Sequence, residues 1–142
     1  MVLPSFAGII LRHGSYYLFL KRSRKSRNWP LHWTVPGGKI EEGENPLDCA
    51  IRETAEEVGV TIRQSDVRAE TIVHATYIDG EKTAYLYLVD TWGGMPDNLE
   101  PELHDDFAWK SLDELPYPMI PHIQAGFDGI LNHKTNIEYH AI

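Results

Sequence analysis

The segment that most constrains the fold is residues 46–58, which has the features of an amphipathic helix with both ends marked. Asn45 is a favourable N-cap, Pro46 suits the first helical position, and Gly59 is a common residue just beyond a helix end. The apolar residues recur at spacings of three and four, and they are Leu47, Ala50, Ile51, Thr54, Ala55 and Val58. We therefore predict a helix over 46–58 that buries this stripe.

Segments with strand character lie on both sides of this helix. The predicted strands are 5–12, 16–22, 33–35, 67–78, 83–92 and 107–109, with turns at 13–15 and 79–82 and a second helix over 119–132. The chain contains no internal repeat and no linker, so we expect a single domain over 1–142. Strands around a central helix, followed by a late helix, predict an α+β fold or a mixed sheet sandwiched by helices.

The charge is segregated along the chain, although the total of −8 suggests only an acidic protein. Residues 1–37 sum to +6, and five of the 13 basic residues fall within 21–27. Residues 38–60 carry two basic and seven acidic residues. Such segregation is typical of a site that needs both signs of charge. The negative total, without a repeated aromatic platform, argues against a nucleic-acid groove.

Other classes are excluded by composition. The one cysteine, Cys49, excludes a disulfide scaffold, and we expect it to be a buried residue of the helix. The seven histidines show no paired metal-ligand spacing, so we do not expect a zinc site. No apolar run reaches the roughly 18 residues of a membrane span, and the first residues lack a signal-peptide pattern. We expect a cytoplasmic protein.

Opposite the apolar stripe, the predicted helix presents Glu53, Glu56 and Glu57. Neighbouring like charges at these spacings cost roughly 0.2–0.5 kcal/mol per pair, and on the helix only the contact from Arg52 to Glu56 offsets them. A divalent cation would explain the arrangement, because clusters of carboxylate oxygens suit Mg²⁺ or Mn²⁺.

The surrounding residues give this cluster a specific pattern. Gly38, Glu44 five residues later, and the run from Arg52 to Val60 seven residues after that resemble the Nudix box, G-x5-E-x7-R-E-U-x-E-E-x-G-U, over 38–60. Thr54 stands where the pattern has its first aliphatic residue. Lys21-Arg22, Pro36 to Lys39, and Trp109 followed by 112–116 also resemble small MutT-like members of this family.

The resemblance implies a fold and an activity. It implies an α/β/α sandwich with a mixed β-sheet, and hydrolysis of a nucleoside diphosphate linked to another moiety by water attack on phosphorus. Glu56, Glu57 and the carbonyl of Gly37 would bind Mg²⁺ or Mn²⁺, with Glu53 as a ligand or the general base. Glu44 and Arg52 would orient these glutamates.

Further positions follow from the same resemblance. It implies phosphate or substrate contacts for Arg22, Gly38 and Lys39. One more acidic ligand is expected from a later loop, where we favour Glu102 over its alternatives Glu100 and Asp105. The aromatic residues Trp29, Trp33, Tyr77 and Trp92 are expected to pack, with stacking on a base as the alternative.

The expected substrate is a nucleoside triphosphate, oxidised ones included, cleaved to a monophosphate and pyrophosphate by a monomer or homodimer. Tyr77, 17 residues after the box, resembles a marker of dinucleoside polyphosphate hydrolases. Ala75 stands where ADP-ribose enzymes have a proline, which disfavours ADP-sugars. A non-catalytic module that binds a nucleotide or RNA is the remaining alternative, and such modules usually lose box glutamates.

Overall fold

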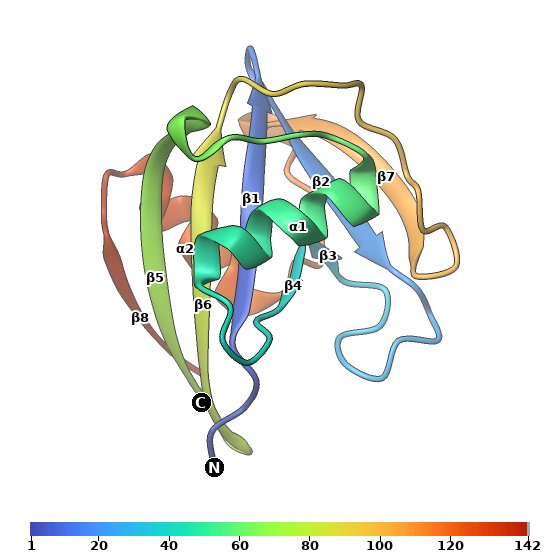
Figure 1. Cartoon of the computed structure of the whole chain (residues 1–142). Coiled ribbons are helices and arrows are strands. Elements are labelled where there is room, and N and C mark those ends of the chain that lie inside the picture. Colours follow the sequence, from blue (N-terminus) through green and yellow to red (C-terminus); the bar gives the residue numbers. More distant parts are fainter. Residues whose placement is uncertain (142) are drawn as a thin grey trace.

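The computed structural model describes residues 1–141, and within them an eight-stranded mixed sheet lies between two helices (Figure 1). Helices α1 (Pro46–Val58) and α2 (Pro121–Leu131) cover opposite faces of the sheet. The strands are β1 (Phe6–His13), β2 (Tyr16–Arg22), β3 (Trp33–Thr34), β4 (Gly37–Lys39), β5 (Val67–Tyr77), β6 (Gly80–Val89), β7 (His104–Ser111) and β8 (Asn136–His140). Short 3₁₀ turns, η1 (Gln64–Asp66) and η2 (Leu112–Glu114), precede β5 and follow β7. This confirms the predicted helix–sheet–helix layering.

Strand β1 organises the sheet, whose order is β3-β2-β1-β6-β5-β8. It runs parallel to β6, and its end pairs with β2 through a hairpin whose turn is Gly14-Ser15. Its first half also pairs with β4, with Gly8 opposite Gly37. Strand β7 pairs with β2 on the other side of the hairpin. The chain around Gly37 is therefore fixed next to the centre of the sheet.

The core is divided by the sheet into two apolar layers. Alternate residues of β1 point to opposite faces, so that Ile9 and Leu11 meet α1 while Ile10 meets α2. The α1 layer contains Cys49, which is fully buried as expected. The first layer packs α1 against the sheet and leaves Glu53 and Glu56 outside the apolar core.

Helix α1 has the boundaries that the sequence predicts. The Asn45 side chain accepts a hydrogen bond of 2.8 Å from the backbone N–H of Asp48. Gly59 ends the helix in the left-handed region at φ 79°, and its N–H donates to the carbonyl of Ala55. Local capping chemistry was therefore sufficient to locate this helix.

Two strands were missed by the sequence prediction, and others have different bounds. Strand β4 contains two glycines, and β8 lies at the sheet edge in parallel pairing with β5. Both form because distant strands supply their hydrogen bonds, which local propensity does not report. Strand β6 begins at Gly80 rather than at 83, because the hairpin turn is Ile78-Asp79, and it ends at Val89. Strand β7 is longer than predicted, and α2 is slightly shorter.

In the described part of the chain, no helix combines the length and apolar character needed to cross a membrane.

Candidate active site

Arg52 connects the carboxylates of Glu53 and Glu56 on α1 with that of Glu44, which precedes the helix. Its Nε and Nη2 donate to the two carboxylate oxygens of Glu44 over 2.8 and 3.0 Å. Its Nη1 donates to Oε1 of Glu53 over 3.0 Å and to Oε1 of Glu56 over 3.3 Å. The hydrogen bonds from Arg52 lower the pKa of Glu44 to about 2. Helical spacing alone predicts only the contact with Glu56, so the charge compensation on this face is broader than that spacing indicates.

Glu53 lies against the backbone of Gly38. A Cβ at position 38 would be 2.5 Å from Cδ of Glu53 and 2.6 Å from its Oε2, closer than real contacts allow. The side chain of Glu53 is 20% exposed, and burial raises the pKa of its carboxyl while Arg52 opposes that shift. The absence of a side chain at Gly38 therefore sets the position of Glu53.

Glu57, in the last turn of α1, points into the protein and is only 8% exposed. Its Oε1 accepts a hydrogen bond of 2.8 Å from the backbone N–H of Gly37, at the start of β4. Burial raises the pKa of Glu57 well above its ordinary value. An ionised carboxylate in this position requires a compensating cation.

The loop that follows β6 is attached to the C-terminal end of α1. The backbone N–H groups of Asp97 and Leu99 donate to the carbonyls of Val58 and Glu57, each over 3.0 Å. These carbonyls have no partner within the helix, so the loop satisfies them. This attachment brings the next residue, Glu100, beside Glu57.

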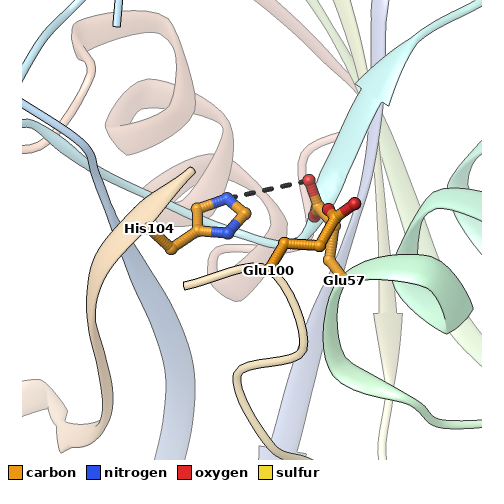
Figure 2. Close-up of side chains that lie close together, drawn as sticks. All are labelled: Glu57, Glu100 and His104. Atoms are coloured by element: carbon orange, nitrogen blue, oxygen red, sulfur yellow. Dashed lines mark ion pairs between the residues drawn. The ribbon is translucent and has the colours of Figure 1, made fainter. Parts of the chain in front are cut away.

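Figure 2 shows that Glu57, Glu100 and His104 converge. One potential ligand atom of each lies within 4.8 Å of the others. His104 is 5% exposed, its Nε2 is 3.7 Å from Oε2 of Glu57, and its buried Nδ1 has no hydrogen-bond partner. Burial, and secondarily the charge of Arg22, lowers the pKa of His104. A neutral imidazole beside two carboxylates is a suitable donor set for a divalent cation, so these residues fit a metal.

The structure separates the candidates for the additional acidic residue. It brings Glu100 to Glu57, whereas the favoured Glu102 is exposed and lies outside this cluster. Asp105 instead accepts a hydrogen bond of 3.3 Å from the backbone N–H of Arg24. The reason is the turn before β7, in which the N–H of His104 donates to the carbonyl of Glu100. The position of Glu102 in the sequence does not reveal this turn.

Arg22 lines a cavity of about 120 Å³ that also contacts Glu57, His104 and Gly37, as well as Lys82. Burial lowers the pKa of both Arg22 and Lys82. Lys39, another predicted substrate contact, is exposed and does not line this cavity. His104 and Lys82 were not predicted from the sequence. The four-residue spacing of Glu100 and His104 was the available signal, because a turn places such residues on one side.

A second hollow of about 470 Å³ shares Asn28, Trp29, Lys82 and His122 with this cavity. Tyr77 also lines it, and the Tyr77 hydroxyl lies 2.8 Å from Nδ1 of His122. The rings of Trp29 and Tyr77 are 5.7 Å apart at 56°. Burial lowers the pKa of His122 to about 3. An aromatic hollow thus continues from the cationic cavity.

The sequence-family model of the NUDIX domain matches residues 2–128 of the chain. The chain belongs to the Nudix family. It is 31% identical over 103 residues to the 8-oxo-dGTP diphosphatase of Escherichia coli, covering 72% of this chain and 76% of that protein. It is 32% identical over 85 residues to bis(5'-nucleosyl)-tetraphosphatase (asymmetrical) of Rattus norvegicus, covering 58% of each.

The fold agrees with solved Nudix structures. The MutT Nudix hydrolase from Burkholderia pseudomallei superimposes with a TM-score of 0.74 at 26% identity, covering 90% of this chain and 97% of that one. This confirms the α/β/α sandwich and the likeness to the MutT group. The chain is a Nudix hydrolase, so the alternative of a non-catalytic module is not supported.

Proposed function

We propose that this Nudix hydrolase cleaves nucleoside triphosphates, oxidised ones included, to a monophosphate and pyrophosphate with Mg²⁺ or Mn²⁺. The observation that carries the proposal is one continuous arrangement of a carboxylate cluster, a cationic cavity and an aromatic hollow. Glu57, Arg22 and Lys82 line the same cavity, and Trp29 belongs to both the cavity and the hollow. A metal, a phosphate group and a base would thus bind next to one another.

The cavity and the hollow differ in what they can hold. The cavity of about 120 Å³ suits a phosphate group, which Arg22 and Lys82 would bind by charge. The hollow of about 470 Å³ falls in the size range of small-molecule clefts. Trp29 at its wall offers a face for stacking on a base. This supports base stacking by Trp29, the alternative to a role in packing alone.

The carboxylates would provide the chemistry of the site. A divalent ion held by Glu56, Glu57 and the Gly37 carbonyl would neutralise the diphosphate oxygens and lower the pKa of water. Glu53 would take a proton from the water that attacks phosphorus, while the bond from phosphorus to the bridging oxygen breaks. Burial raises the pKa of Glu53, which makes its carboxylate a better proton acceptor than an exposed one.

Arg52 and Glu44 would position the carboxylates rather than touch the substrate. Glu44 is held by two hydrogen bonds from Arg52, which in turn reaches Glu53 and Glu56. This chain of contacts would fix the direction of Glu53, the proposed proton acceptor. The predicted substrate contact of Lys39 gains no support from its exposed position.

A nucleotide panel with Mg²⁺ tests the proposal. We expect equimolar monophosphate and pyrophosphate from at least one triphosphate, resolved by anion-exchange chromatography. Glu57→Gln should reduce turnover by orders of magnitude while the protein remains folded by circular dichroism. Glu42→Gln is the matched control, since Glu42 is exposed and lies outside the cluster of Glu57, Glu100 and His104. Undiminished turnover in Glu57→Gln, or no pyrophosphate from any triphosphate, would refute the proposal.

A second candidate substrate is a dinucleoside polyphosphate. Tyr77 lies in the aromatic hollow beside Trp29, so a second aromatic face is available there. The likeness to the tetraphosphatase of Rattus norvegicus also supports a dinucleoside polyphosphate as the substrate. Diadenosine tetraphosphate should then be cleaved asymmetrically, to ATP and AMP, faster than any triphosphate. Slower cleavage than the best triphosphate would exclude it as the preferred substrate.

A further inference from the structure

His104 occupies an unusual position for a polar side chain. It is 5% exposed, and its Nδ1 is buried with no hydrogen-bond partner among the described residues. Its Nε2 lies 3.7 Å from Oε2 of Glu57, which exceeds the length of a hydrogen bond. An unpaired buried polar atom costs about 1–3 kcal/mol, so the ring is held in place at a cost to the fold.

The surroundings of His104 indicate what would satisfy it. Glu57 and Glu100 face the ring, and one potential ligand atom of each of the three residues lies within 4.8 Å of the others (Figure 2). Ionised carboxylates can only accept hydrogen bonds, so they cannot donate to the nitrogen lone pair of the imidazole. A cation would satisfy the carboxylate oxygens and, at the same time, the lone pair of the ring nitrogen that carries no proton.

We propose that His104 is a nitrogen ligand to a divalent ion held with Glu57 and Glu100, and that it shifts this position from Mg²⁺ toward first-row transition ions. The inference deepens the metal-dependent function proposed above and rests on it. Mg²⁺ prefers oxygen ligands, whereas imidazole suits transition ions such as Co²⁺ and Ni²⁺. The carboxylate of Glu56 and the carbonyl of Gly37 remain oxygen ligands beside this mixed set.

Binding of Co²⁺ and Mg²⁺, each added alone to the full chain, tests the preference by calorimetry. His104→Gln should weaken Co²⁺ binding by about tenfold or more and leave Mg²⁺ binding within about twofold. His74→Gln is the matched control, because His74 is an exposed residue of β5 remote from the cluster, and it should change neither affinity. Equal losses for the two ions, or no loss of Co²⁺ affinity, would overturn the inference.

Nuclear magnetic resonance of the unmutated chain gives a second readout that does not depend on folding of a variant. With Co²⁺ bound, the ring N–H of a ligating histidine should give a strongly shifted, solvent-exchangeable resonance, which ¹⁵N-histidine labelling identifies. No such resonance in the Co²⁺-saturated chain would overturn the inference. The resonance without hydrolysis of any nucleotide would support the ligand and refute the proposed function. Nucleotide hydrolysis without the resonance would do the reverse.

Discussion

Replacing Gly38 with alanine should impair catalysis without unfolding the protein. The added Cβ would lie 2.5 Å from Cδ of Glu53, and an ordinary carbon–carbon separation is about 3.5 Å, so the carboxylate must move by about 1 Å. Such a displacement of a reacting group can reduce the rate by about 10²-fold. The atoms that clash belong to the end of a side chain, so we expect a stability loss near the lower end of the roughly 1–3 kcal/mol for overpacking.

Turnover of the best nucleotide and urea unfolding of the same samples check this prediction. Gly93→Ala is the matched control, because a Cβ there would meet Thr61 at 3.8 Å, an ordinary contact. Its turnover and stability should resemble those of the unmutated protein. If Gly38→Ala retained turnover within about threefold, a 1 Å shift would not matter and Glu53 would not be the proton acceptor.

Three further predictions concern the carboxylate network. Burial raises the pKa of Glu57, so its contribution to stability is present below the ordinary carboxyl pKa and lost as pH rises through the folded value. In metal-free buffer, Glu57→Gln should therefore be more stable than the unmutated chain by about 0.5–2 kcal/mol near pH 8, and the two proteins should be equally stable near pH 4. Urea unfolding measures both stabilities, and a difference that does not depend on pH would contradict this prediction. Arg52→Lys, which cannot bind Glu44 through two parallel bonds, should lower kcat about 10- to 100-fold in steady-state assays, and unchanged kcat would argue against positioning. Glu100→Gln should weaken divalent-ion binding about tenfold or more in calorimetry, and Glu102→Gln should weaken it less than about twofold. The opposite order would indicate that Glu102 is the additional metal ligand.

Much of the fold was accessible from local patterns, and the exceptions share one cause. Helix α1 and the first hairpin were located because capping residues, turn residues and periodicity act over a few positions. Strands β4 and β8 were missed because their pairing partners, β1 and β5, lie far away in the sequence. Long-range hydrogen bonds impose strand structure on segments with weak strand propensity. Cytoplasmic location and a monomeric or homodimeric state stay predictions.

The sequence by itself determined where the carboxylates of α1 stand along the helix, because helical spacing alone places Glu53, Glu56 and Glu57 opposite the apolar stripe. The tertiary structure decided how far each glutamate is buried and what surrounds it. Only the attachment of the loop after β6 to the end of α1 brings Glu100 and His104 to Glu57. These contacts join residues that are distant in the chain, and no local spacing records them.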